Sequence, residues 1–205
     1  MNGKTHQLVG LTGGVLASAF MIQYNIFQPY DCLALLAMSS VGSFLPDIDH
    51  TGSTAGKRAP ILSYPIHGLS KLFSLLYKKS KWNIFDKLSE MFSHRGICHS
   101  PLLWIVLFLP MFMFIPPLIV VSWIKPLVIA GIIGLAIGVG LHLIADMLNP
   151  TGIPLFMPIF NHKFSIGKIV TGSKSEIVFK IFVILAFLAS CGFAIYVLKG
   201  VIHGI

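Results

Sequence analysis

The chain has 205 residues, of which 55% are hydrophobic and only 11% are charged, and its mean hydropathy is +0.84. This composition excludes a soluble globular domain. The formal net charge is +8 at pH 7, which raises nucleic-acid binding as an alternative. No compact basic motif with interleaved aromatic residues stands alone, so no nucleic-acid partner is expected. The three cysteines form no CxxC pair and indicate neither a disulfide framework nor a zinc knuckle.

Apolar segments occur at residues 7–22, 32–45, 102–121, 127–148 and 177–198. Their length and continuity exclude the alternating strands of an outer-membrane barrel and predict an all-α integral membrane protein. We expect about five transmembrane helices in a single domain covering residues 1–205. The first two segments are short, so one of them could be re-entrant. The first also has the outline of a secretory signal, whose cleavage would remove His6.

Lysine and arginine are distributed unevenly between the two expected sides of the membrane. Basic residues in short loops are retained on the cytoplasmic side. Eight lie between the second and third segments: Lys57, Arg58, Lys71, Lys78, Lys79, Lys81, Lys87 and Arg95. Lys163, Lys168 and Lys174 precede the last segment, and the opposite side keeps only Lys125 and Lys199. We therefore expect a multi-pass membrane protein with its N-terminus in the cytoplasm.

Two amphipathic patterns lie within the cytoplasmic segment, at about residues 60–93. Apolar residues recur at helical spacing in both, as Ile66, Leu69, Leu72, Phe73 and Leu76 and then as Trp82, Phe85, Leu88, Met91 and Phe92. They predict interfacial helices, and packing of the same helices on the span ends is equally compatible. Pro60 and Pro65 are expected to precede the first helix, and residues 52–56 to form a small-residue loop.

Histidine and aspartate residues stand at the expected cytoplasmic ends of four spans. They are His6, Asp47, Asp49, His94, His99, His142 and Asp146. Singly, such residues can be caps, turn residues or snorkelling side chains. An aspartate inside an apolar span is costly, however, and His142 and Asp146 share one helix face. Gly134 and Gly138 continue that stripe and would let a neighbouring helix approach closely.

Four imidazoles and three carboxylates form a mixed nitrogen and oxygen donor set. This set suits zinc, with manganese or iron as alternatives, better than calcium. Seven ligands exceed one tetrahedral site, so we expect either two ions or one ion with outer carboxylates that orient the imidazoles. Gly96 permits a turn that would bring His94 and His99 together. Arg95 is placed to bind a phosphate or carboxylate, with lipid-headgroup contact as the alternative.

The ordered motifs LPDID, HRGICHS, HLIADMLNPTG and TGSKSE resemble the YdjM-like family, described as LexA-binding, inner membrane-associated, metal-dependent hydrolases. The resemblance runs along essentially the whole chain. It implies a location in the bacterial inner membrane, hydrolytic activity, and a polar signature made of Asp47, Asp49, His94, His99, His142 and Asp146. Glu176, in TGSKSE, fits the pattern as a general base or a further ligand. A first-turn glutamate favoured by the helix dipole is the alternative.

We therefore expect a metal-dependent hydrolase with its centre at the cytoplasmic membrane interface. Arg95 and Glu176 are the candidate catalytic residues, and the expected substrate is an amphiphilic lipid ester or phosphoester. Membrane lipid is the expected partner, and homo-oligomer formation stays open. The alternative is a non-enzymatic membrane protein with a structural or transported metal, or one that acts through a partner. A transport path would need polar residues throughout the bilayer depth, whereas these cluster at one end.

The uneven distribution of lysine and arginine generates a topology prediction. A cysteine probe placed at Ser53 or Lys168 is expected to escape labelling from outside intact cells, and a probe near Gln28 is expected to react. Labelling at Ser53 together with protection near Gln28 would invert the orientation.

Overall fold

The computed structural model describes residues 2–203, and most of them are helical. The described residues contain five helical segments long and apolar enough to cross a membrane. They are α1 (Gly3–Gln23), α2 (Pro29–Gly42) continued by the 3-10 helix η1 (Leu45–Asp49), α6 (Pro101–Leu118), α7 (Ile124–Met147) and α8 (Lys174–His203). The prediction of an all-α membrane protein with about five spans is confirmed.

The other elements lie between these spans. They are α3 (Thr54–Arg58), α4 (Pro60–Ser80), α5 (Asn83–Met91), the 3-10 helix η2 (Ile97–His99), and the short antiparallel strands β1 (Ile153–Pro154) and β2 (Lys163–Phe164). A turn built on Asn149 connects α7 to β1, because its side-chain oxygen accepts hydrogen bonds from the backbone N–H and the hydroxyl of Thr151. Asn149 stands two residues after Met147, the last residue of α7.

Both short N-terminal segments become full spans of 21 residues. The first helix begins earlier than its apolar residues indicate, because the Asn2 side chain accepts a hydrogen bond from the backbone N–H of Lys4 and so caps the start of α1. His6 therefore lies inside α1 and not before it. The second span gains its length from η1, which continues α2 through the LPDID motif.

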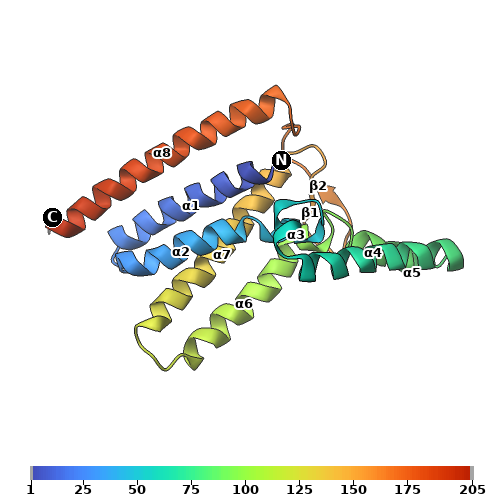
Figure 1. The fold of residues 1–205 in the computed structure, drawn as a ribbon, viewed down its shortest axis with the longest axis horizontal. Coiled ribbons are helices and arrows are strands. Elements are labelled where there is room, and N and C mark those ends of the chain that lie inside the picture. Colours follow the sequence, from blue (N-terminus) through green and yellow to red (C-terminus); the bar gives the residue numbers. More distant parts are fainter. Residues whose placement is uncertain (1, 204–205) are drawn as a thin grey trace.

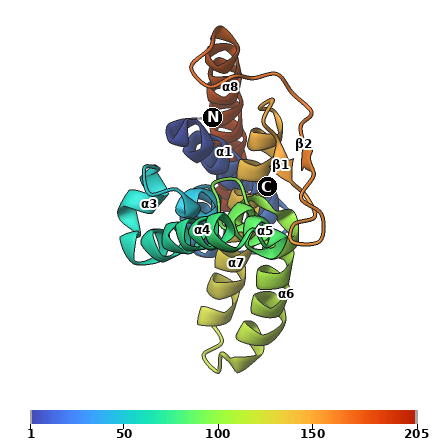
Figure 2. The same ribbon diagram turned by 90° about the vertical axis from the view of Figure 1, so that its right-hand side faces the viewer.

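The spans form a bundle in which α1, α2 and α7 pack together, α8 runs beside α1, and α6 runs beside α7 (Figure 1). The N-terminus lies at the end of the bundle that also carries α3 and the strands, and α8 carries the chain to the opposite end. Figure 2 views the molecule from the right-hand side of Figure 1 and shows α4 and α5 in front of the bundle. We call the end near the N-terminus the site end.

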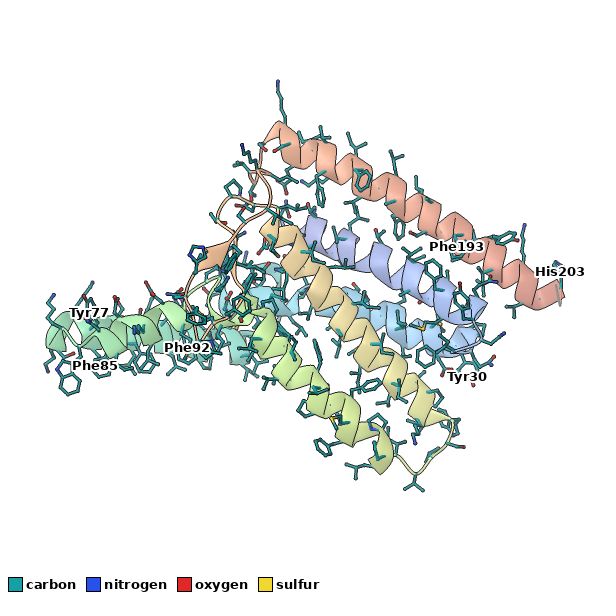
Figure 3. All side chains as sticks on the ribbon, turned by 180° about the vertical axis from the view of Figure 1, so that it is seen from behind. Tyr30, Tyr77, Phe85, Phe92, Phe193 and His203 are labelled. Atoms are coloured by element: carbon teal, nitrogen blue, oxygen red, sulfur yellow. The ribbon has the colours of Figure 1, made fainter. Side chains whose placement is uncertain are left out.

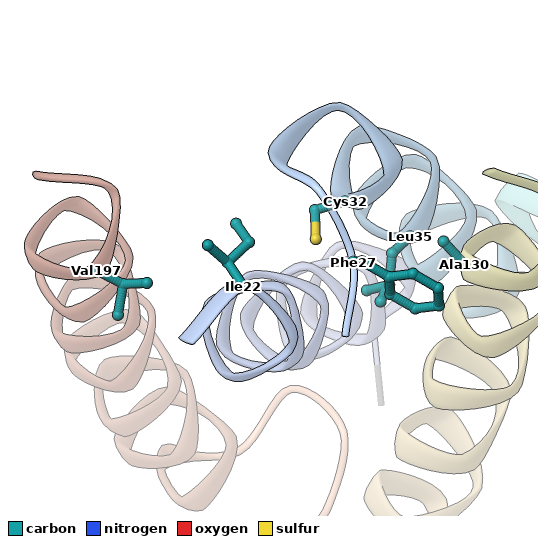
Figure 4. Close-up of a cluster of buried hydrophobic side chains, with 6 residues drawn as sticks. All are labelled: Ile22, Phe27, Cys32, Leu35, Ala130 and Val197. Atoms are coloured by element: carbon teal, nitrogen blue, oxygen red, sulfur yellow. The ribbon is translucent and has the colours of Figure 1, made fainter. Parts of the chain in front are cut away.

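The opposite end of the bundle is held by an apolar cluster (Figure 4). It consists of Ile22, Phe27, Cys32, Leu35, Ala130 and Val197, which come from four spans and the turn between α1 and α2. The buried Asp31 has a capping role at this end, since its carboxylate accepts a hydrogen bond of 3.1 Å from the backbone N–H of Gln28. Apolar packing therefore fixes one end of the bundle, while the predicted polar residues gather at the other.

Helices α2 and α7 approach so closely that their backbones touch. A side chain at Gly134 would overlap the carbonyl of Leu35, and one at Gly138 would overlap the carbonyl of Ser39 and the amide of Ser43. The predicted close approach of a neighbouring helix along this glycine stripe is confirmed, and the neighbour is α2. Because η1 follows α2 directly, this contact also sets the position of the LPDID motif beside the end of α7.

Helices α4 and α5 form a hairpin that extends away from the site end of the spans (Figures 1 and 3). Stacking of Phe73 with Phe85 and Phe92 holds the two helices together. The expected breaks before the hairpin are wrong in detail. Pro65 lies inside α4, because Pro60 at the first helical position already fits a helix start. The expected loop over residues 52–56 is partly helical as α3, which is capped by the Ser53 hydroxyl.

The contact between α2 and α7 generates a stability prediction with a built-in control. Gly138→Leu is expected to lower the midpoint of thermal unfolding, because overpacking of this kind costs about 1–3 kcal/mol. Gly140→Leu, two residues away on the same helix, is expected to leave the midpoint close to wild type, because a side chain there would meet nothing within 4 Å. Equal midpoints for the two variants would contradict the close packing.

Candidate metal centre

The site end of the bundle brings together all seven predicted ligand residues. His6 comes from α1, Asp47 and Asp49 from η1, His94 from the loop before η2, His99 from η2, and His142 and Asp146 from α7. They form three overlapping groups whose ligand atoms lie within 4.8 Å of one another: His6 with His142 and Asp146, Asp47 with His99 and His142, and Asp49 with His94 and His99. These groups could hold a metal ion.

The inner part of the cluster is built on Asp146. His6 Nε2 lies 3.4 Å from Asp146 Oδ1, and His142 Nε2 lies 3.7 Å from Asp146 Oδ2 and 3.7 Å from Asp47 Oδ1. The two imidazole rings stack with centroids 3.9 Å apart. Both histidines and Asp146 are at most 1% exposed. The inner nitrogens and oxygens therefore face one another across a buried space.

His99 connects the inner part to an outer part. Its Nε2 lies 3.5 Å from Asp47 Oδ1 and 3.3 Å from Asp146 Oδ2, while its Nδ1 lies 3.3 Å from Asp49 Oδ2. The other oxygen of Asp49 lies 3.0 Å from His94 Nδ1. His94 is the most exposed member, with 43% of its side chain accessible. Asp49 thus orients two imidazoles, which is the outer-carboxylate role expected beside a metal.

The orientation of His142 tests whether a cation fits between these groups. Its Nδ1 donates a hydrogen bond of 2.7 Å to the Ser43 carbonyl, so in the neutral ring the lone pair is on Nε2. That lone pair faces carboxylate oxygens of Asp47 and Asp146, and Nε2 has no hydrogen-bond partner among the described residues. Acceptors facing acceptors in a buried space repel unless a cation lies between them. The donor set therefore fits a metal ion.

The charges around the cluster point to the same conclusion. Three carboxylates, from Asp47, Asp49 and Asp146, lie within the cluster, where the guanidinium of Arg95 pairs with Asp146 and the backbone N–H of Arg95 with Asp49. Carboxylates gathered in this way favour a cation between them, either a metal ion or a protonated imidazole. Burial acts to lower the pKa of His99, but the three carboxylates outweigh burial and raise that pKa to about 10. A metal that binds here would take the place of such a proton.

Arg95 belongs to the cluster and not to the lipid-facing surface. Its Nη2 donates a hydrogen bond of 3.0 Å to Asp146 Oδ1, and its backbone N–H donates one of 3.3 Å to Asp49 Oδ2. The tight turn that allows both contacts places Arg95 at φ +61°. The adjacent Gly96 is required because a side chain there would overlap the carbonyl oxygen of Met91. The predicted turn that brings His94 and His99 together is therefore present.

A cavity of about 310 Å³ opens beside the cluster. Its lining includes His6, Asp47, His50, Ser53, Thr54, His94, Arg95 and Asp146. His50 was missed by sequence reasoning, although it directly follows the LPDID motif. Its Nδ1 accepts a hydrogen bond of 3.0 Å from the backbone N–H of Gly52, so in the neutral ring the proton is on Nε2. The only signal in the sequence was its position one residue after Asp49.

Glu176 has a different set of partners. Its carboxylate accepts hydrogen bonds from the backbone N–H groups of Asn2, at 3.0 Å, and Gly172, at 2.7 Å. Thr5 donates to the same carboxylate at 3.4 Å, and Lys180 lies 3.7 Å away. Among the described residues, no group of potential ligand atoms includes Glu176. Glu176 therefore connects the start of α8 to the start of α1, the helix that also carries His6. The glutamate is not part of the cluster itself.

The cysteines stay outside the cluster as well. Cys98 lies between residues of the site loop, but burial raises the pKa of its thiol to about 12, so it remains protonated. A protonated thiol is a poor metal ligand. The cluster therefore contains nitrogen and oxygen donors alone among the described residues.

Fold and site together define an α-helical membrane protein with a buried histidine and aspartate cluster at one end of its spans. The chain belongs to the YdjM family, because the family model described as YdjM inner membrane protein matches residues 1–202. It is 29% identical over 158 residues to the uncharacterized protein YvsG of Bacillus subtilis (strain 168), covering 77% of this chain and 74% of that protein.

The chain is also similar to the inner membrane protein YdjM of Escherichia coli (strain K12) and of Shigella flexneri. Each is 31% identical over 158 residues, which cover 77% of this chain and 66% of the relative. No solved structure matches the chain. The membrane location and the family are thus established, and the family resemblance of the four motifs is confirmed.

The cluster generates a metal-content prediction. The purified wild-type protein is expected to contain about one to two transition-metal ions per chain. His142→Ala and Asp47→Ala are each expected to lower this content while the protein stays inserted, because each removes an inner ligand. Glu176→Gln is the matched control and is expected to keep its metal. Full metal occupancy in both ligand variants, measured by elemental mass spectrometry, would refute the ligand assignment.

Proposed function

We propose that the protein is a membrane-embedded hydrolase that uses one or two divalent transition-metal ions, with zinc the first choice and manganese or iron the alternatives. The proposed substrate is an amphiphilic ester or phosphoester with an anionic group near the bond that is cleaved. The polar cavity on one side of the cluster carries this proposal. Structural metal sites are closed, whereas catalytic sites keep one position open to water or substrate.

Five residues would hold the metal, namely His6, Asp47, His99, His142 and Asp146. When bound, the ion would supply a water of lowered pKa, and hence hydroxide near neutral pH. The Ser43 carbonyl fixes the ring orientation of His142, and Asp49 fixes that of His99. These contacts keep the ligand nitrogens in place before any ion or substrate arrives.

Two side chains that line the cavity can act on the substrate directly. Arg95 holds one N–H group on Asp146 and is 15% exposed, so its remaining donors can bind an anionic oxygen in the cavity. His50 presents its Nε2 proton as a second donor, because Gly52 occupies Nδ1. An anionic ester group in the cavity would therefore be bound by the positive charge of Arg95 and oriented by directional hydrogen bonds from Arg95 and His50.

The distribution of charge supports a cytoplasmic site. The lysines of the α4–α5 hairpin, namely Lys71, Lys78, Lys79 and Lys87, lie at the same end of the spans as the cluster. Lys125 starts α7 at the opposite end. Because basic loops are retained in the cytoplasm, the proposed substrate is an amphiphile of the inner leaflet.

Hydrolysis assays on the purified, metal-loaded protein test the proposal. A panel of phospholipids and soluble phosphoesters in mixed micelles is expected to contain a substrate, and His142→Ala is expected to abolish its hydrolysis. Arg95→Asn is expected to lower kcat/KM by about 10²-fold or more without loss of metal, because it removes a charged donor from the cavity. Asparagine is chosen because it tolerates the positive φ of Arg95.

Lys125→Ala is the matched control for a lost positive charge, and it is expected to keep wild-type kinetics. A metal-loaded wild type that hydrolyses nothing in the panel, with variants that only unfold at lower temperature, would contradict the hydrolase. That outcome would favour a structural metal.

A further inference from the structure

A second cavity lies within the membrane-spanning part, between α6 and α7, and its volume is about 440 Å³. We call it the α6–α7 groove. Its walls are one stripe of side chains from each helix, at helical spacing, including Trp104, Phe108 and Phe112 on α6 and Ile132, Ala136 and Val139 on α7. Every lining side chain is apolar apart from the indole N–H of Trp104. This N–H donates a hydrogen bond of 2.7 Å to the Cys98 carbonyl.

The groove has a buried floor and an open side. Ile132, Val139 and Leu143 on α7 are at most 6% exposed, whereas Ile105 and Leu109 on α6 are more than half exposed. An apolar groove that is open to the bilayer interior is filled by hydrocarbon, because no other flexible apolar material is present at that depth. A lipid chain is therefore the occupant that this groove fits.

The length of the groove matches one leaflet of the membrane. Its α6 wall runs from Pro101 to Phe112, which at 1.5 Å per residue is about 17 Å. The hydrocarbon core of a bilayer is about 30 Å thick. One hydrocarbon chain of the leaflet at the site end would therefore fill the groove from the membrane surface to about the midplane.

The upper end of the groove lies at the depth of the metal centre on both helices. Pro101 follows His99 by two residues, and Leu143 follows His142 directly. A hydrocarbon chain in the groove thus places the polar part of the same molecule level with the histidines. The donor groups of the cluster fit a metal ion, and the open position of that ion together with the remaining N–H groups of Arg95 would bind an anionic head.

We infer that the α6–α7 groove binds one hydrocarbon chain of an anionic amphiphile whose head lies at the level of the metal centre. The identity of this amphiphile as substrate rests on the proposed function, whereas the binding itself does not. The groove would then select substrates by their hydrocarbon chain, and the metal centre would select them by their anionic head.

Gly140 offers a direct way to fill the groove. It lines the groove, and a Cβ there would meet nothing within 4 Å, so a leucine would extend into the space of the chain. Gly192 on α8 is the matched control, because a side chain there also meets nothing within 4 Å and Gly192 is not among the groove residues.

Trp104 reports on the occupant by fluorescence. In a protein with Trp82→Phe and Trp123→Phe, it is the remaining tryptophan of three. The protein is placed in phosphatidylcholine nanodiscs that contain a low fraction of either brominated phosphatidic acid or brominated phosphatidylcholine, since bromine on the chain quenches nearby indole. We expect stronger quenching by the phosphatidic acid. Gly140→Leu is expected to remove this difference, and Gly192→Leu to retain it.

Equal quenching by the two brominated lipids would mean that the groove holds bulk lipid only, and this would overturn the inference. A difference that survives Gly140→Leu would place the selective site elsewhere and would also overturn it. Failure of the hydrolase proposal gives a different result from failure of this inference. In that case the selective quenching would persist in a protein that hydrolyses nothing. If hydrolysis is found, Gly140→Leu is expected to raise KM for long-chain substrates and to leave a soluble short-chain ester unaffected.

Discussion

The backbone contact between α2 and α7 is the constraint on which the rest of the site depends. Gly138 allows the Ser39 and Ser43 backbone to lie directly against α7. One turn later, the Ser43 carbonyl accepts a hydrogen bond from His142 Nδ1, and this turns the other ring nitrogen toward the cluster. Because η1 continues from α2, the same contact delivers Asp47 beside that nitrogen. Small residues in the middle of the membrane thus set the geometry of polar groups at its edge.

The cluster that this contact assembles gathers three carboxylates, from Asp47, Asp49 and Asp146. Buried carboxylates are tolerated when they are paired or bind a cation, and the guanidinium of Arg95 pairs with Asp146. Two conditions follow, because the carboxylates need positive charge nearby and the Nε2 lone pair of a neutral His142, which faces Asp47 and Asp146, needs a partner. A metal ion satisfies both conditions at once, which is why binding of metal and stability of this end of the bundle are expected to be linked.

Helix α7 carries different chemistry on its two faces. The face with Gly138, His142 and Asp146 packs on α2 and builds the cluster, while the face with Val139 and Leu143 forms the floor of the α6–α7 groove. Successive residues of a helix point about 100° apart, so one span can serve a polar site and an apolar groove at the same depth. A single helix therefore connects the place where a polar head would react with the place where its hydrocarbon chain would lie.

The sequence by itself determined the spans and the seven candidate ligands, because hydropathy and the cost of an aspartate in an apolar helix are local properties. It did not determine what each residue contacts. Glu176 matched the motif pattern, yet its carboxylate accepts a hydrogen bond from Asn2, and His50 lines the cavity although only its position next to Asp49 marked it. The Arg95 pair with Asp146 joins residues 51 positions apart. Such contacts depend on which helices are neighbours, and that is decided by packing between distant segments.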